Sequence, residues 1–147
     1  LPRFAVLDCT IISEDQEASV HYGDGAITVL VDQGTTPRFY LDVTIANQGQ
    51  IPTIAQQAVL TKPFEPDLLS VEFGPGLHSL AAGGSGDTKR AEIKLDSFRP
   101  YERRRLKFPF EYQGNGDRSQ ITLTVRSTKG GEIQRRISLD IVPSNLQ

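Results

Sequence analysis

The segment 38–46, RFYLDVTIA, constrains the fold of this chain more than any other stretch. Every second residue in it is a large apolar one, namely Phe39, Leu41, Val43 and Ile45. Successive side chains of a β-strand point to opposite faces, so this alternation predicts a strand with one face buried. The Asn47-Gln48-Gly49 sequence that follows is typical of a turn.

Similar alternating segments recur along the chain, separated by Gly, Pro and Asn. The expected strands are Arg3–Ile12, Ala26–Val31, Arg38–Ala46, Asp67–Phe73, Ala91–Leu95, Arg104–Tyr112, Gln120–Ser127 and Glu132–Val142, and Ile54–Thr61 stays open between a strand and a helical turn. No segment carries a helical apolar stripe of useful length. Many short strands with turn residues between them predict an all-β fold, a β-sandwich or a barrel.

The last three expected strands are separated by glycine-rich turns. Gly114-Asn115-Gly116-Asp117 precedes one and Lys129-Gly130-Gly131 precedes the next, and both suit tight hairpins. We therefore expect a three-stranded antiparallel meander at the C-terminal end. Its predicted core residues are Leu106, Phe108, Phe110, Tyr112, Ile121, Leu123, Val125, Ile133, Ile137, Leu139 and Ile141. Pro109 has no N–H, which predicts an edge strand or a bulge at that position.

Length and composition indicate a single β-sandwich domain over residues 1–147. Apolar residues make up 37% of the chain, enough for a core, and Cys9 is the only cysteine, so no disulfide can form within the chain. The chain has no methionine and begins at Leu1, from which we expect a module excised from a larger protein. No apolar run is long enough to span a bilayer.

The order of features resembles a known group of bacterial domains. An alternating strand closes in Asn47-Gln48-Gly49, a later one ends in Ile93-Lys94-Leu95, and Phe98-Arg99-Pro100-Tyr101-Glu102 leads into Leu106-Lys107-Phe108. Residues 27–142 in this respect resemble the immunoglobulin-like repeats of bacterial surface and accessory proteins, in particular the cell-adhesion-related bacterial domain. The resemblance implies an antiparallel immunoglobulin-like β-sandwich of about seven to nine strands, and an adhesive, spacing or docking role without catalytic residues. It slightly favours an extracellular or cell-surface location, which the residues themselves leave open.

Motifs for metal binding and catalysis are missing from the sequence. His21, His78 and Cys9 lack the spacing of a zinc site. Loop carboxylates offer oxygen ligands for calcium, but solvated acidic loops explain them better; they are Glu14, Asp15, Glu17, Asp24 and Asp117. Ser85 does not sit in a nucleophile motif. We expect a non-enzyme with no cofactor and no metal.

The basic residues near position 105 form the one patterned polar feature. Arg103, Arg105 and Lys107 alternate with the apolar face of their strand, and Arg126 and Arg136 have corresponding outward positions on the next two strands. Together they predict a cationic stripe across one sheet, with an acidic protein surface or an anionic polymer as its ligand. A solvated face that protects a sheet edge explains these residues better than a ligand site does. The pI of about 5.7 and the lack of interleaved aromatic residues argue against nucleic acid.

Two further expectations concern single side chains. Tyr40 and Tyr101 are the outward aromatic residues on which a sugar ring could stack. Arg135 shares the apolar face of Ile133 and Ile137, so it requires an acidic partner such as Asp8, Asp42 or Glu72, or a strand that extends past the sheet. The sequence thus predicts a non-catalytic interaction, docking or spacer module that contacts a protein or its own parent chain, with a carbohydrate- or polyanion-binding module as the alternative.

Overall fold

The chain folds into two packed β-sheets. Its computed structural model describes residues 4–48, 67–81, 87–95, 98–114, 117–127 and 131–144. These residues form ten strands and no helix. The strands are β1 (Phe4–Ser13), β2 (Ala18–Tyr22), β3 (Ile27–Asp32), β4 (Arg38–Asn47), β5 (Leu68–Phe73), β6 (Leu77–Ser79), β7 (Arg90–Lys94), β8 (Arg103–Tyr112), β9 (Arg118–Ser127) and β10 (Gly131–Ser144).

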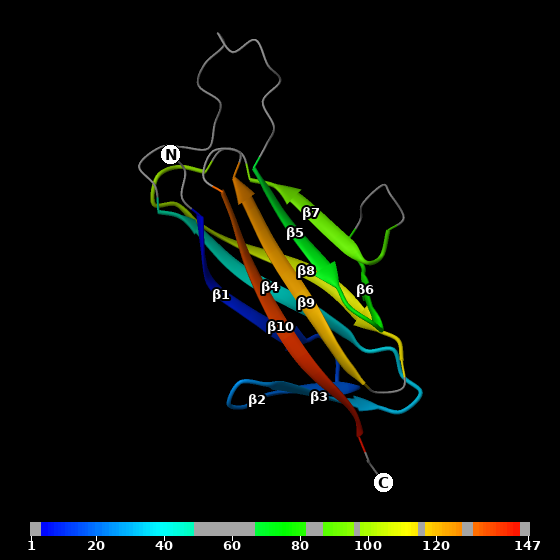
Figure 1. Cartoon of the computed structure of the whole chain (residues 1–147). Helices are drawn as coiled ribbons and strands as arrows, with labels where there is room; N and C mark the ends of the chain where they lie inside the picture. The colour runs from blue at the N-terminus through cyan, green and yellow to red at the C-terminus, as the bar shows by residue number, and fades with distance from the viewer. Residues whose placement is uncertain are drawn as a thin grey trace.

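The strand order defines a four-stranded and a six-stranded sheet. The smaller sheet runs β1-β4-β8-β6 and the larger one β2-β3-β10-β9-β5-β7. In Figure 1 the larger sheet lies in front, and the short β2–β3 hairpin extends it at the lower end. Neighbouring strands are antiparallel with one exception, because β3 pairs with β10 in parallel. The all-β prediction is confirmed, and the architecture is a two-layer sandwich.

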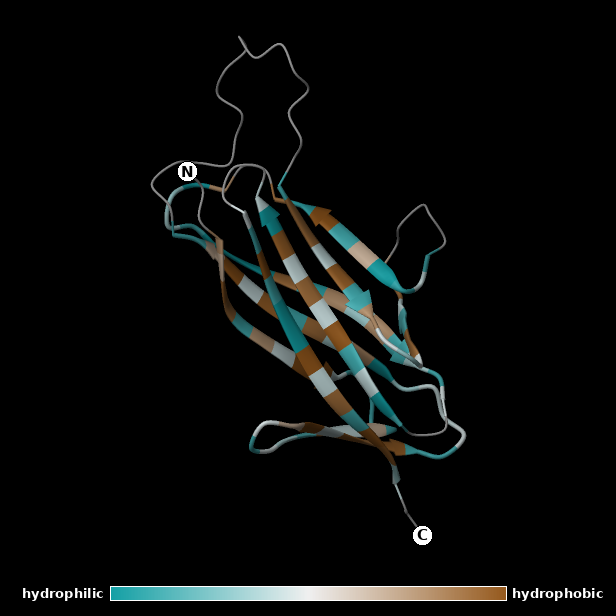
Figure 2. Ribbon diagram, in the orientation of Figure 1, coloured by the Kyte–Doolittle hydropathy of each residue, from teal (hydrophilic) through white to brown (hydrophobic). Residues whose placement is uncertain are grey.

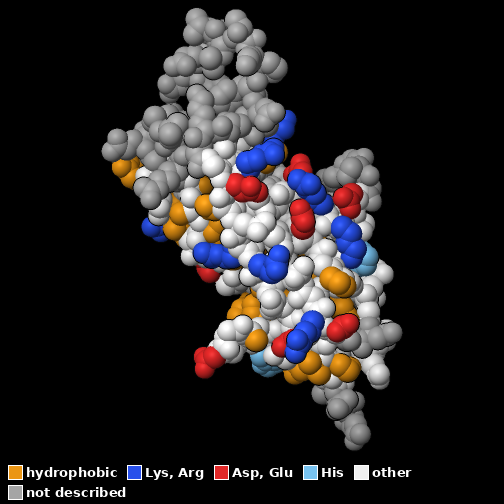
Figure 3. All heavy atoms as spheres, viewed as in Figure 1, with side chains coloured by type: hydrophobic (Ala, Val, Ile, Leu, Met, Phe, Trp, Pro, Cys, Tyr) orange, Lys and Arg blue, Asp and Glu red, His pale blue; other side chains and the backbone are white. Residues whose placement is uncertain are grey.

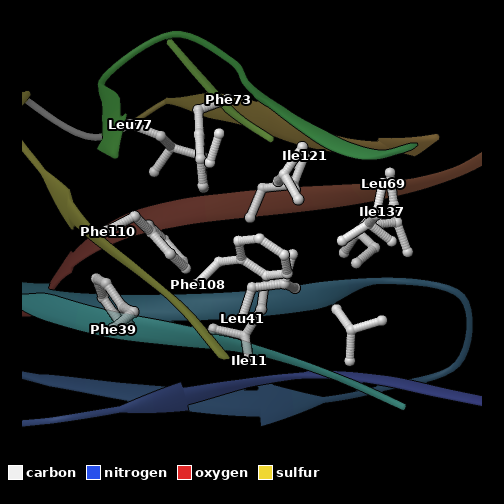
Figure 4. Packing of buried hydrophobic residues seen from close by; sticks show 14 of the residues in the cluster. Ile11, Phe39, Leu41, Leu69, Phe73, Leu77, Phe108, Phe110, Ile121 and Ile137 are labelled. Carbon is white, nitrogen blue, oxygen red and sulfur yellow. The ribbon is translucent and has the colours of Figure 1, made fainter. Parts of the chain in front are cut away.

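The core lies between the two sheets and is built from the alternating residues that the sequence marks. Leu41, Val43 and Ile45 of β4 are fully buried, and Figure 2 shows the same alternation of apolar and polar positions along β9. Aromatic rings join the layers: Phe110 of β8 stacks on Phe39 at 5.3 Å between ring centroids and contacts Phe73 of the facing sheet at 5.3 Å (Figure 4).

Most expected strands form within a few residues of their predicted bounds, but two were missed. β2 is a short strand whose side chains are largely polar and exposed, and β6 has only three residues. Neither is long enough to show a clear alternating pattern. The ambiguous segment Ile54–Thr61 lies outside the described residues.

The predicted C-terminal meander is wrong in part. β9 and β10 do form a hairpin, in which Ser127 pairs with Gly131. β8, however, belongs to the other sheet and lies between β4 and β6, so the turn that ends at Asp117 carries the chain across the sandwich. Alternation reports which face of a strand is apolar, and both sheets of a sandwich turn such a face inward, so the pattern cannot assign a strand to a sheet.

A second crossing, between β5 and β6, depends on glycine. Gly76 has a φ of +76°, and a Cβ atom placed there would lie 2.8 Å from the ring of Tyr112. Only glycine fits both the left-handed backbone and the close approach of this ring. The crossing brings Leu77 into the core, where it is 1% exposed.

Candidate functional site

The predicted cationic stripe divides between the two outer faces of the sandwich. Arg103, Arg105 and Lys107 lie on β8 in the four-stranded sheet. Arg126 and Arg136 lie on β9 and β10 in the six-stranded sheet. The prediction of one stripe on one sheet is therefore wrong, for the same reason that the meander is. Figure 3 shows the side of the molecule seen in Figure 1, on which basic and acidic side chains are intermixed.

The middle cation of the β8 row is bound by a buried carboxylate. Arg105 donates from Nε to both carboxylate oxygens of Asp42, at 2.8 and 2.9 Å, and from Nη2 to Oδ2. Asp42 is 5% exposed and lies on β4, next to Lys107 in the strand register. The hydrogen bonds from Arg105 lower the pKa of Asp42 and raise that of the arginine. This pair joins two strands and neutralises the centre of the row.

The two tyrosines proposed for stacking lie far apart. Tyr40 faces Pro109 across the sheet, its ring lies 5.8 Å from Lys107 Nζ, and its hydroxyl donates to Glu14 Oε1 at 3.3 Å. Tyr101 is 68% exposed and precedes the opposite end of β8. Six residue steps of β8 separate Pro109 from Arg103, about 20 Å at ~3.3 Å per residue, and Tyr101 lies before Arg103. The structure does not bring the two rings into one platform.

Tyr101 has an unusual backbone in the turn before β8. Its φ is +62°, and its N–H donates to the carbonyl of Asn47 at 2.6 Å. Glu102 accepts a hydrogen bond from the Arg99 N–H at 3.1 Å and also binds Arg104, and these contacts lower its pKa. The Arg104 guanidinium lies 4.0 Å from the centre of the buried Phe98 ring. The turn is thus held by its own polar contacts, which sequence patterns did not reveal.

The acidic loop residues considered for calcium also lie apart. Glu14, Asp15 and Glu17 belong to the β1–β2 connection, whereas Asp24 lies between β2 and β3 and Asp117 precedes β9. Asp15 accepts hydrogen bonds from the backbone of Glu17 and Arg38. Across the described ranges, no three His, Cys, Asp or Glu side chains gather as a metal site would require.

The N-terminal half of β10 is open on one side, a feature that the sequence analysis missed. β10 pairs with β9 from Gly131 to Asp140, but with β3 only from Leu139 onward. No described strand pairs with residues 131–138 on the side away from β9, and we call this side the open edge of β10. All side chains from 131 to 136 are exposed.

Backbone geometry shows which residues present hydrogen-bonding groups at the open edge. The Ile141 N–H donates to the Asp117 carbonyl at 2.9 Å, beside β9. In an antiparallel ladder the residues alternate in the side to which both N–H and C=O point. The odd residues of β10 therefore bond β9, and Glu132, Gln134 and Arg136 direct their N–H and C=O groups outward. Polar residues at both odd and even positions of 132–136 were the sequence signal for this solvated half.

The surroundings of Arg135 on β10 show how a charged side chain is accommodated at an inward position. Arg135 is exposed, and its Nη2 donates across the sandwich to the Val6 carbonyl of β1, in the opposite sheet, at 3.3 Å. Arg135 lies opposite Leu123 in a continuous register with β9, so the strand does not run past its own sheet there. Within the described residues no ion pair joins Arg135 to Asp8, Asp42 or Glu72, and Asp42 pairs with Arg105 instead. Ile133, predicted to be in the core, is 40% exposed, because this half of β10 is paired on one side only.

Cys9 lies near Arg135 on the inner side of β1. Burial raises the pKa of its thiol to about 11, and the positive charge of Arg135 opposes the shift only in part. The thiol is therefore protonated near neutral pH.

The two-layer β-sandwich and its open strand edge define the class of this domain. Residues 32–138 match the model of a family described as a domain of unknown function, DUF8731. The match covers more than half of the chain, which therefore belongs to this family. It ends at Ser138, so it includes the open edge of β10 and excludes the residues that pair with β3. A search of curated proteins finds no match to the chain.

Among the described residues, no helix has the length and apolar character needed to cross a membrane.

Proposed function

We propose that this domain is a non-catalytic docking module that binds an extended protein segment along the open edge of β10. The observation that carries this proposal is the row of outward N–H and C=O groups at Glu132, Gln134 and Arg136, all on exposed residues. Sheet edges of this kind bind peptides by strand addition, in which main-chain hydrogen bonds supply affinity and alternate side chains supply specificity. The partner is a separate protein or another part of the parent chain.

The neighbouring contacts support docking at this place. On the inner side, Ile133 and the stem of Arg135 offer partly apolar surface to alternate side chains of an added strand. On the outer side, Glu132 and Arg136 offer both signs of charge. A hollow of about 290 Å³ lies at the lower end, lined by residues from Gly23 to Ile27 and by β10 from Arg135 to Ser138. An added strand has room to end there, before it reaches β3.

An experiment with extended peptides tests this function. Eight-residue peptides rich in β-branched residues, with different charge patterns, would be titrated against the protein by fluorescence anisotropy. Binding should protect the amides of Gln134 and Arg136 from hydrogen exchange and should be lost in Gln134→Pro, which removes an outward N–H. Substitution of Glu72, exposed on the outer face of the interior strand β5, is the control. Absence of binding by every peptide would contradict the proposal.

The row on β8 favours a second candidate, an anionic polymer ligand. Arg103, Arg105 and Lys107 project from one face at every second residue, and a linear polyanion matches such a row. Asp42 neutralises Arg105, which leaves Arg103 and Lys107 for the ligand. Salt-sensitive retention on a heparin column, lost in R103E/K107E and kept in R126E/R136E, would support this candidate. Equal retention of both double variants would remove it.

The immunoglobulin-like character of the sandwich belongs with these proposals. An adhesive, accessory or spacing role in a bacterial surface protein follows from the resemblance of residues 27–142 alone. Two packed sheets are compatible with it, but fold likeness does not assign a function.

A further inference from the structure

We propose that the segment bound at the open edge of β10 is the same edge of a second copy of this chain. In this arrangement two β10 strands pair antiparallel about a two-fold axis at Gln134, and the two larger sheets become one. The inference rests on the proposed docking function and names its partner. A two-fold contact of this kind uses one surface twice, so it requires that the surface be complementary to itself.

The charges of the open edge meet that requirement. When Gln134 faces Gln134 of the second copy, Glu132 of each copy lies directly opposite Arg136 of the other. Both side chains belong to the outer face, because the odd residues Ile137 and Leu139 point into the core. Directly opposite charges on neighbouring strands attract, and this register forms two such pairs. Within the described part of the chain, neither Glu132 nor Arg136 takes part in an ion pair.

The length of the open edge selects the same register. Pairing centred on Gln134 runs from Gly131 opposite Ile137 through to Ile137 opposite Gly131. It stops before Leu139, where β3 occupies the neighbouring position. A centre at Arg135 would place two arginines directly opposite each other, which is unfavourable. A centre at Ile133 would use fewer of the outward backbone groups at Glu132, Gln134 and Arg136.

Two other described edges, those of β8 and β1, are less suited to self-pairing. β6 pairs only with the end of β8, from Phe110 to Tyr112. The rest of this edge of β8 carries three cations and ends at Pro109. Like charges and proline both oppose edge pairing. The free side of β1 is occupied by side chains: the Tyr22 hydroxyl bonds both N–H and C=O of Ile11, and Arg135 binds the Val6 carbonyl. β10 combines accessible backbone groups with complementary charges.

Analytical ultracentrifugation of the full chain tests this dimer. The edge contact is small, so we expect a weak, reversible association in which the average mass rises from 16.2 kDa toward twice that value with concentration. E132R and R136E should each raise the dimer dissociation constant by about tenfold or more, since attraction becomes repulsion in both pairs. E72R, with the same charge change on an interior strand of this sheet, should leave it unchanged.

Two combinations of the charge reversals, one in a single chain and one between two chains, test the register itself. The swap E132R/R136E restores opposite charges in both pairs and should restore the wild-type dissociation constant. An equimolar mixture of E132R and R136E should also form a dimer, since the two arginines of one variant face the two glutamates of the other. Circular dichroism and thermal unfolding of each variant confirm that the exposed substitutions leave the monomer folded.

Three results would overturn the inference: a monomer at every accessible concentration, a dimer that ignores these substitutions, or single variants that do not complement each other. The peptide experiment tests the proposed docking function separately from the dimer. If the chain stays monomeric but peptides still protect Gln134 and Arg136, docking at the open edge stands and only the second copy is wrong. If neither copies nor peptides bind there, both are wrong.

Discussion

The two halves of β10 belong to one continuous strand and have opposite environments. From Leu139 the strand is paired with β3 as well as β9, and its inward residues Leu139 and Ile141 are at most 5% exposed. From Gly131 to Arg136 it is paired on one side, and every side chain is exposed. Ile133 has the same alternating position as Ile137 and is 40% exposed. The comparison teaches that a strand's apolar face is buried only where another layer lies against it.

The largest expected effect is the difference in stability lost when a large apolar residue is replaced in each half of β10. Leu139→Ala removes a side chain that is 2% exposed and should lower the free energy of unfolding by about 2–5 kcal/mol. Ile133→Ala should cost less than about 1 kcal/mol, because much of that side chain already contacts water. Urea titrations with common slopes measure both values. Equal losses at the two positions would mean that the upper half is covered after all.

Proline substitutions at neighbouring positions sharpen the assignment of the open edge. Arg135→Pro removes an N–H that bonds β9, and we expect a loss of about 1–3 kcal/mol from the unpaired carbonyl and the broken ladder. Gln134→Pro removes an N–H that points outward, so its loss should be clearly smaller. Thermal unfolding by circular dichroism ranks the pair. The reverse ranking would show that our alternation of backbone directions is shifted by one residue.

The acid dependence of stability compares a paired carboxylate with an unpaired one. Hydrogen bonds from Arg105 lower the pKa of Asp42 in the folded chain. Ionised Asp42 therefore stabilises the fold above its unfolded pKa of about 4, and the contribution is lost as the pH falls through the lower folded value. Asp42→Asn should lower stability at pH 7 and reduce its fall between about pH 5 and pH 2.

Glu132→Gln at the open edge is the control for Asp42→Asn. Its side chain is exposed, so the substitution should leave the monomer's stability at pH 7 unchanged, measured at a concentration too low for self-association. A wild-type acid profile retained in Asp42→Asn would contradict the assignment of this pH dependence to the Asp42–Arg105 pair.

The smallest expected effect concerns the reactivity of Cys9, which reports how far solvent reaches the space beside Arg135. The pKa of Cys9 is raised to about 11 by burial, so its alkylation by iodoacetamide should be slow at pH 8 and increase until about pH 11. The same shift should make the folding stability fall as the pH rises above the unfolded thiol pKa of about 8.5, because the unfolded chain then ionises Cys9 while the folded chain keeps it protonated. A reactivity curve with a midpoint near pH 8.5, that of a free cysteine, would show that the space beside Arg135 is open to water.

Local pattern was a sound guide to strands and a poor guide to their neighbours. The alternation in β4, β8 and β9 predicted both the strands and their buried faces. It also predicted a cationic row on β8, which exists, and joined it to Arg126 and Arg136, which lie on the other outer face. The open edge of β10 could be suspected from the polar run 132–136, but its backbone direction follows only from the register with β9.

The sequence by itself determined the all-β class, most strand positions and which residues could enter a core, because side-chain alternation is a property of each strand alone. Only the tertiary structure decided the sheet to which each strand belongs, the pairing of Asp42 with Arg105, and the exposure of half of β10. These depend on contacts between segments far apart in the chain. A two-residue period does not carry that information, since the same alternating strand fits either sheet and either a paired or an open edge.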